Sequence, residues 1–168
     1  MAELCLVIGG ARSGKSRFAE GLVAARPGPW TYIATGEALD AEMAARIAAH
    51  RAGRGRGWRT IEAPIELAAA LGRVPPGEAV LVDCLTLWLA NHLMAGHDLE
   101  AEAARLEAAL AGRRGPLWLV SNEVGMGIVP ENALARRFRD AAGQLNQRIA
   151  ARADRVLLVA AGLPLALK

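Results

Sequence analysis

The sequence predicts an α/β domain built on a mainly parallel β-sheet that is flanked by helices. The chain has 168 residues, of which 53% are hydrophobic, and short apolar runs alternate along it with longer segments of helical period. A chain of this length can bury about 70% of the surface that its unfolded form exposes, so it can form a core without disulfides or a structural metal. We therefore expect one domain over residues 1–168.

Five apolar runs are continuous rather than alternating in hydrophobicity, which is typical of strands that are buried on both faces of a sheet. These runs are residues 4–8, 31–34, 79–83, 117–121 and 155–160. After a turn, residues 163–168 begin with Leu163 and Pro164. They predict a short antiparallel edge strand at the C-terminus, because proline is tolerated at strand starts and at sheet edges.

Helices are predicted between these runs, at residues 15–26, 41–52, 65–72, 85–95, 98–113 and 131–153. The stretch 53–57 reads Gly-Arg-Gly-Arg-Gly and has no apolar residue to anchor it. It is predicted to be a loop that leads into a short segment at 58–63.

Charge and cysteine content argue against several classes of partner. The formal net charge is only +3, and the arginine-rich stretch 51–59 holds a single aromatic residue, Trp58, so we expect no nucleic-acid partner. Cys5 and Cys84 lie in apolar runs and are interpreted as buried thiols rather than as a disulfide or a zinc site. No basic leader precedes the first run and no apolar stretch approaches ~20 residues, so we expect no membrane insertion and a cytoplasmic location.

The strongest motif is the G-x-x-x-x-G-K-[ST] pattern of a phosphate-binding loop, the P-loop, between a predicted strand and a predicted helix. Glycines let backbone N–H groups face a phosphate, and the helix N-terminus adds partial positive charge. In this pattern Lys15 contacts the β- and γ-phosphates, and the Ser16 hydroxyl binds Mg²⁺. The predicted nucleotide-binding residues of this P-loop domain are Gly9, Gly10, Ala11, Arg12, Ser13, Gly14, Lys15 and Ser16.

Acidic residues follow two other predicted strands. Asp83 ends a buried run and is predicted to be the second metal ligand beside Ser16, while an N-cap role for the next helix is an alternative that does not exclude the first. Glu123 lies just beyond the run 117–121, at the edge of an open α/β sheet that faces the ligand crevice. It could equally be a cap or loop carboxylate.

The lysine count excludes signalling GTPases. Their guanine-reading Asn-Lys-x-Asp motif needs a lysine, and this chain has only Lys15 and Lys168. A small-molecule kinase or a nucleotidyltransferase fits a chain of this size better than a motor ATPase.

Several sequence blocks, taken together with their order along the chain, narrow the class of P-loop protein to which this sequence can be compared. They are residues 9–16, Tyr32-Ile-Ala-Thr, Asp40-Ala-Glu-Met-Ala-Ala-Arg-Ile, Asp83-Cys-Leu-Thr, Ser121-Asn-Glu-Val-Gly-Met-Gly-Ile-Val-Pro and Asn146-Gln-Arg. In these blocks, over essentially its whole length, the sequence resembles the bifunctional adenosylcobinamide kinase/adenosylcobinamide-phosphate guanylyltransferases of cobalamin biosynthesis.

The resemblance implies two reactions. A nucleoside triphosphate, GTP or ATP, first phosphorylates the hydroxyl of adenosylcobinamide. GTP then donates GMP to an enzyme histidine and releases pyrophosphate, and adenosylcobinamide phosphate takes up the GMP to give adenosylcobinamide-GDP. The resemblance also implies Mg²⁺ as cofactor and a homotrimer.

The resemblance places the histidine nucleophile at His50, so the expected catalytic residues are His50 and Lys15. Helical spacing from a cap at Asp40 puts Met43, Ile47 and His50 on one stripe, and a structural histidine at the edge of the core is the alternative. A neutral imidazole is a competent nucleophile toward an α-phosphate. The nucleotide contacts that the resemblance adds are Thr35, Gly36, Glu37, Arg51, Ala52, Gly53, Arg54, Glu62 and Asp83.

Three other features receive weaker interpretations. His92 and His97 flank a helix-to-helix turn and are predicted to be surface residues. Exposed apolar residues near Trp88 and Leu89 are one place where an oligomer interface could lie. Residues 125–130 form a Gly-rich turn with no assigned role.

Two rival functions stay open, namely a P-loop kinase for another small alcohol with a structural His50, and a nucleotide-binding switch without transferase chemistry.

Overall fold

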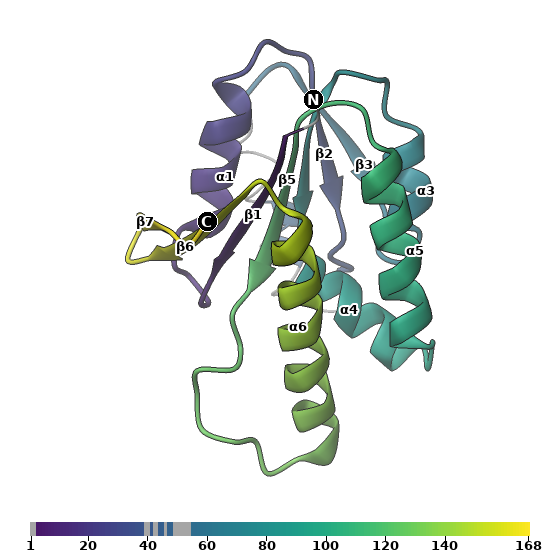
Figure 1. Ribbon diagram of the computed structural model, residues 1–168, viewed down its shortest axis with the longest axis vertical. Coiled ribbons are helices and arrows are strands. Elements are labelled where there is room, and N and C mark those ends of the chain that lie inside the picture. The colour runs from purple at the N-terminus through teal and green to yellow at the C-terminus, as the bar shows by residue number, and fades with distance from the viewer. Residues whose placement is uncertain (1–2, 39–40, 42–43, 46, 49–54) are drawn as a thin grey trace.

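The computed structural model describes residues 3–38, 41, 44–45, 47–48 and 55–168, and its central element is a β-sheet (Figure 1). The strands are β1 (Leu4–Gly9), β2 (Trp30–Ala34), β3 (Trp58–Glu62), β4 (Ala79–Asp83), β5 (Leu117–Asn122), β6 (Arg155–Ala160) and β7 (Leu163–Ala166). They form one seven-stranded sheet in the order β3-β2-β4-β5-β1-β6-β7. All neighbouring strands are parallel except β6 and β7, which confirms the predicted sheet and its antiparallel last strand.

The helices are α1 (Lys15–Ala24), α3 (Leu67–Gly72), α4 (Leu85–Met94), α5 (Leu99–Gly112) and α6 (Ala133–Arg152). Five of these segments were expected from the sequence, with ends that differ by one or two residues. Of the predicted helix 41–52, residues 41, 44–45 and 47–48 are helical, and the remainder lies outside the described residues.

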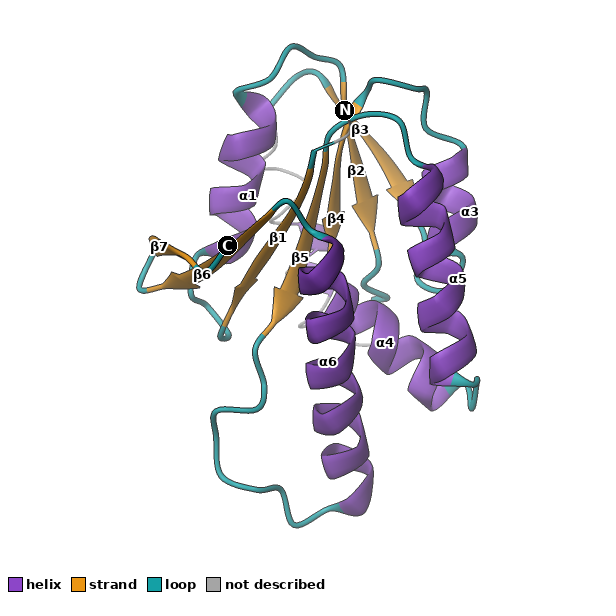
Figure 2. Ribbon diagram, viewed as in Figure 1, coloured by secondary structure: helices purple, strands orange, loops and turns teal. Residues whose placement is uncertain are grey.

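The sheet separates two hydrophobic layers (Figure 2). Helix α1 packs on one face through Ala19 and Val23, and the other helices cover the opposite face. Strand β1 contributes to both layers, since Leu6 belongs to one core cluster and Cys5 to the other. A strand buried on both faces has no need for polar alternation, which explains the continuous apolar runs.

The sheet has one more strand than the sequence predicted. Residues 58–62, expected as a short segment after a loop, form β3, which pairs with β2 at the edge of the sheet. It mixes polar with apolar residues, and the polar pair Arg59 and Thr60 is exposed, so a search for continuous apolar runs did not find it. An edge strand with one solvated side is expected to show this weaker pattern.

Both cysteines are buried and free, as predicted. Desolvation raises the pKa of the Cys5 thiol and that of the Cys84 thiol to about 11 each. Both thiols are therefore protonated at neutral pH and are poor nucleophiles.

The prediction for His92 is wrong, because its side chain is only 1% exposed, whereas His97 is exposed as expected. The two Nδ1 atoms are 2.9 Å apart, and His92 Nε2 lies 3.2 Å from the Ile65 carbonyl oxygen. A carbonyl only accepts, so His92 Nε2 carries the proton and His92 Nδ1 accepts from His97 Nδ1. Spacing alone could not reveal this arrangement at a helix-to-helix turn.

His92 is expected to make the stability depend on pH. Burial, with a smaller contribution from His97, lowers its pKa below the ordinary 6.5. The unfolded chain therefore takes up the proton first, so the free energy of unfolding falls as pH drops from 6.5 toward the folded pKa and is unaffected by this group above 6.5. An NMR titration should give His92 a midpoint below 6.5, and a midpoint at or above that value would contradict the burial of His92.

From the sequence, exposed apolar residues near Trp88 and Leu89 are one place for an oligomer interface, but these two side chains are themselves buried. Each is 2% exposed, and the Trp88 indole donates to the Ile65 carbonyl at 2.9 Å. Trp88 and Leu89 are thus covered by the chain itself, whereas Met94 at the end of α4 is exposed. Among the described residues, none of the helices combines the length and the hydrophobicity that crossing a bilayer requires.

Candidate active site

The parallel strands all end at one edge of the sheet, and the predicted site residues follow them there (Figure 1). The P-loop follows β1, Thr35 follows β2, Cys84 follows β4 and Glu123 follows β5. In a sheet of this kind the ligand crevice lies outside these carboxyl ends. The topology thus brings together segments that are far apart in the sequence.

The P-loop has the strand–loop–helix context that the motif predicts. A Cβ at Gly9 would lie 2.5 Å from the Val159 carbonyl oxygen, so only glycine fits where β1 ends. Gly14, the N-cap of α1, has φ +92°, a left-handed conformation that favours glycine. The first turn of α1 holds no acidic residue, so its N–H groups and partial positive charge are available to a phosphate.

Lys15 is 8% exposed, and its Nζ donates to the Gly10 carbonyl at 3.2 Å. The ammonium therefore folds back over the P-loop. Its positive charge also lowers the pKa of the Cys84 thiol slightly, against the larger effect of burial. The ammonium therefore lies near the end of β4. A lysine between the P-loop and β4 lies where phosphate oxygens would be neutralised.

Asp83 is the last residue of β4, and the Tyr32 hydroxyl donates to its Oδ2 at 3.0 Å. The N-cap alternative for Asp83 is wrong, because the N-cap of α4 is Cys84. Ser16 lies in the first turn of α1, which packs against β4. A hydroxyl and a carboxylate are hard oxygen donors of the kind that Mg²⁺ binds together with phosphates, so this donor set fits the metal.

Tyr32 is a site residue that the sequence argument missed. Its ring is buried in β2, with the side chain 5% exposed, and its only polar atom reaches the Asp83 carboxylate. The available signal was a tyrosine inside a buried run, since a buried hydroxyl needs a partner. The sequence did not say which partner.

Thr35 ties the end of β2 to the end of β4. It is fully buried, and its hydroxyl accepts from the Cys84 N–H and donates to the Cys84 carbonyl, both at 2.7 Å. Its backbone N–H donates to the Asp83 carbonyl at 3.2 Å. With the hydroxyl engaged in this way, Thr35 holds Asp83 in position, and a direct contact with a nucleotide stays a prediction.

Replacing Thr35 with valine is expected to lower the free energy of unfolding by about 1–3 kcal/mol, because valine matches its shape but leaves the buried Cys84 N–H unpaired, while the Cys84 carbonyl keeps the Trp88 N–H as its partner. Chemical denaturation should show a lower midpoint with an unchanged slope. Thr60→Val is the control at an exposed threonine on strand β3, and it should lower stability by less than Thr35→Val does, because its side chain is not buried. Equal stability of the two variants would contradict the role of Thr35.

A second polar network fixes the end of β5. The Thr86 hydroxyl accepts from the Asn122 N–H at 2.6 Å and lies 3.3 Å from the Ser121 hydroxyl. The Asn146 amide of α6 donates to the Asn122 carbonyl at 3.1 Å. These residues belong to three of the blocks that carry the family resemblance. Their positions show that the blocks meet in space beside the P-loop.

Glu123 has a local role in the structure. Its backbone N–H donates to the Gly9 carbonyl at 3.0 Å, and its carboxylate accepts from the Gly125 N–H. The carboxylate thus has a partner within its own loop, and Glu123 also lies at the sheet edge beside the P-loop, so a contact with a ligand stays a prediction. The following residues 124–129 are exposed.

The remaining predicted residues divide into two groups. Gly36 is half-buried, Glu37 is exposed at the same sheet edge, and Glu62 is exposed at the end of β3. The other group lies outside the described residues and consists of His50, Arg51, Ala52, Gly53 and Arg54.

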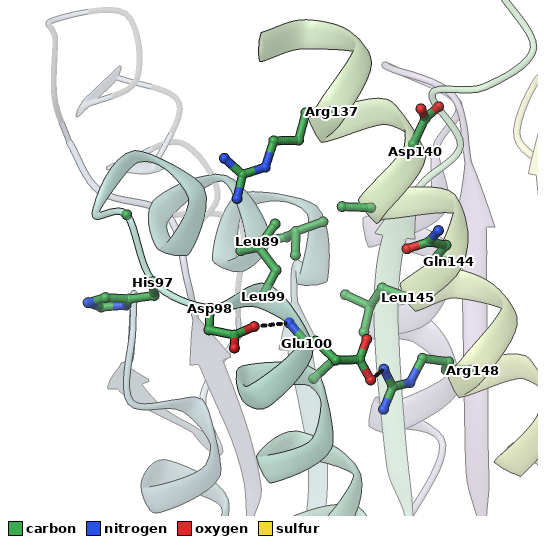
Figure 3. A pocket seen from close by; sticks show the side chains of 13 residues that line it. Leu89, His97, Asp98, Leu99, Glu100, Arg137, Asp140, Gln144, Leu145 and Arg148 are labelled. Carbon is green, nitrogen blue, oxygen red and sulfur yellow. Dashed lines mark hydrogen bonds and ion pairs between the residues drawn. The ribbon is translucent and has the colours of Figure 1, made fainter. Parts of the chain in front are cut away.

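A cavity of about 740 Å³ lies between the α4–α5 turn and α6 (Figure 3). Leu89, Leu99 and Leu145 form part of its wall, and Arg148 at its rim pairs with Glu100 at 2.5 Å. His97 points away from it (Figure 3). None of the predicted site residues that the structure describes is among those lining this cavity.

Fold and site together define a P-loop nucleotide-binding enzyme with a lysine and a carboxylate at one sheet edge. The family model described as cobinamide kinase / cobinamide phosphate guanyltransferase matches residues 5–167. The chain belongs to this family.

Relatives agree along nearly the whole chain. The bifunctional adenosylcobalamin biosynthesis protein CobP of Pseudomonas aeruginosa is 50% identical over 97% of this chain and 96% of its own length. The proteins named CobU of Salmonella typhimurium and Escherichia coli are 46% and 44% identical, each over 98% of this chain and 99% of their own length.

Proposed function

We propose that this single domain, residues 1–168, phosphorylates adenosylcobinamide with a nucleoside triphosphate and then transfers GMP from GTP to the resulting phosphate. One observation carries the proposal: a complete P-loop with a buried lysine lies beside an oriented aspartate in a chain that the family model matches over residues 5–167. The predicted product is adenosylcobinamide-GDP.

In the first reaction, the P-loop N–H groups and Lys15 hold the triphosphate and stabilise charge that develops on the transferred phosphoryl group. Ser16 and Asp83 would hold Mg²⁺, which neutralises phosphate charge when bound. The Tyr32 hydroxyl holds the Asp83 carboxylate and Thr35 holds the backbone at Asp83 and Cys84, so little reorganisation is needed when substrates bind.

In the second reaction, the imidazole of His50 attacks the α-phosphorus of GTP and a bond forms between ring nitrogen and phosphorus. The bond to the pyrophosphate oxygen breaks, and pyrophosphate leaves with that electron pair. A phosphate oxygen of adenosylcobinamide phosphate then attacks the same phosphorus and releases the neutral histidine. Arg51 and Arg54 are suited to offer cations to the phosphate oxygens.

We also propose a homotrimer in the cytoplasm, with small molecules rather than nucleic acids as partners. Large apolar side chains that are exposed in the described part of the chain favour self-association, among them Met126 at 82%, Ile128 at 97% and Leu163 at 72%. The mass in solution, measured by light scattering, tests the trimer.

Incubating the chain with Mg²⁺, GTP and adenosylcobinamide tests the function directly. Mass spectrometry of the corrinoid should show adenosylcobinamide phosphate first and adenosylcobinamide-GDP later. Phosphorylation without GMP transfer would contradict the second reaction alone. An unchanged corrinoid would favour a kinase for another small alcohol, and slow hydrolysis unaffected by corrinoid would favour the nucleotide-binding switch.

Replacing Asp83 with asparagine is expected to raise the Mg²⁺ concentration needed for half-maximal kinase rate by about 10–100-fold, because a metal-binding carboxylate loses its charge. Asp140→Asn, on the exposed side of α6, is the control and should leave the Mg²⁺ dependence unchanged. An unchanged Mg²⁺ dependence in Asp83→Asn would remove Asp83 from the metal site.

A further inference from the structure

The phosphorylation of adenosylcobinamide needs a proton acceptor, and none of the residues assigned above takes that role. The nucleophile is an alcohol, which keeps its proton at neutral pH, so the proton must leave as the oxygen attacks phosphorus. The second reaction has no such need, because a phosphate monoester has a second pKa of about 6 and is already largely dianionic. A base that serves the alcohol is therefore expected to affect the first reaction alone.

The topology places one titratable side chain directly beside the strand that leads into the P-loop. Strand β1 has two neighbours in the sheet, β5 and β6 (Figure 2). Strand β6 runs into a turn whose residues, Ala161 and Gly162, do not titrate. Strand β5 is followed at once by Glu123. Glu123 is therefore the carboxylate that the sheet brings nearest to the start of the P-loop.

Backbone hydrogen bonds fix Glu123 against the first residues of the P-loop. Asn122 is paired with Gly9 in the parallel register of β1 and β5, and the Glu123 N–H donates to the Gly9 carbonyl at 3.0 Å. Lys15 Nζ donates to the next carbonyl, that of Gly10, at 3.2 Å. Two successive P-loop carbonyls thus hold Glu123 and the ammonium that would neutralise the β- and γ-phosphates. The side chain of Glu123 begins in the part of the site where the phosphoryl group would be transferred.

The Glu123 carboxylate is oriented and keeps one oxygen available. Its Oε1 accepts from the Gly125 N–H, and a Cβ at Gly125 would lie 2.9 Å from Oε1, so the glycine leaves the room that this contact needs. The residue is half-buried. Within the part of the chain that the structure describes, Oε2 has no hydrogen-bond donor. A carboxylate held at one oxygen can accept a proton at the other.

The other carboxylates at this edge of the sheet are less suited to the task. Asp83 is on β4, already accepts from the Tyr32 hydroxyl at 3.0 Å and is assigned to Mg²⁺, and a carboxylate bound to a cation is a weak proton acceptor. Glu37 follows β2 and Glu62 ends β3, so both lie on the far side of β4 from the P-loop strand.

We propose that Glu123 is the general base of the kinase reaction. The hydroxyl oxygen of adenosylcobinamide forms a bond to the γ-phosphorus, and the bond from that phosphorus to the β–γ bridging oxygen breaks. The nucleoside diphosphate leaves with that electron pair, and the hydroxyl proton passes to Glu123 Oε2 and later to water. The inference rests on the proposed function, since it takes the corrinoid hydroxyl as the nucleophile and the P-loop as the phosphate site.

Replacing Glu123 with glutamine tests the proposal without disturbing the loop. Glu123→Gln removes the proton acceptor but keeps a side-chain oxygen that can accept from the Gly125 N–H. Glu131→Gln, at an exposed glutamate of the same connection between β5 and α6, is the matched control. Three quantities are measured for each variant: kcat for phosphorylation of adenosylcobinamide by ATP, kcat for GMP transfer from GTP to supplied adenosylcobinamide phosphate, and calorimetric binding of ATP with Mg²⁺.

Glu123→Gln should lower kcat for phosphorylation by about 10²-fold or more, leave GMP transfer within about threefold and not weaken ATP binding. Glu131→Gln should match the wild type in all three. A loss of phosphorylation smaller than about tenfold would overturn the inference. An equal loss of both reactions, or weaker ATP binding, would also overturn it, because Glu123 would then support the site rather than take a proton. If the wild-type chain itself does not phosphorylate adenosylcobinamide, the proposed function fails and this inference fails with it.

Discussion

Replacing Lys15 with alanine is expected to lower the rate of phosphoryl transfer by about 10²–10³-fold or more, because the transferred group loses its nearest fixed positive charge. Lys15 is buried in the P-loop and near the end of β4, where water cannot replace its ammonium effectively. The measurement is the rate of adenosylcobinamide phosphate formation at saturating triphosphate.

Lys168→Ala is the control, because Lys168 is the only other lysine of the chain. Its ammonium donates to the carbonyls of Ala150 and Ala151 near the end of α6, far along the chain from the P-loop. This variant should keep the wild-type rate. If Lys15→Ala folds normally and phosphorylates at more than about a tenth of the wild-type rate, the P-loop does not perform the kinase reaction as described.

Replacing His50 with alanine is expected to separate the two reactions. GMP transfer should become undetectable, since removal of a nucleophile eliminates the covalent step, while phosphorylation should keep its rate within a few-fold. Supplying adenosylcobinamide phosphate with GTP measures the second reaction alone, and supplying adenosylcobinamide with ATP measures the first.

His97→Ala is the matched control for the removal of an imidazole, because His97 is exposed and lies outside the predicted site. It should retain both activities. Equal loss of phosphorylation and of GMP transfer in His50→Ala would indicate a structural histidine, and full retention of GMP transfer would exclude His50 as the nucleophile.

The fold could be predicted wherever burial leaves a strong trace in the sequence. Strands β1, β4 and β5 are covered on both faces and appear as continuous apolar runs. Strand β3 was missed because an edge strand keeps polar residues such as Arg59 and Thr60. The P-loop was predicted correctly because its spacing and its strand–helix context are both local.

The contacts that support the site could not be predicted, because they join distant segments. Tyr32 reaches Asp83 across 51 residues of sequence, and Thr35 reaches Cys84 across 49. The sequence marks both as polar atoms in buried strands that need partners, but only the strand order β2-β4 supplies those partners. His92 was misplaced for the same reason, since its burial depends on the Ile65 segment.

The measurement that tests the account most directly is the intact mass of the protein after incubation with Mg²⁺ and GTP in the absence of corrinoid. The wild-type chain should gain the mass of one GMP, in a bond that is labile to acid and stable to alkali as expected of a phosphoramidate, and His50→Ala should gain nothing. If GTP binds and no adduct forms, or if His50→Ala carries the same adduct, then the transfer of GMP through His50 is contradicted.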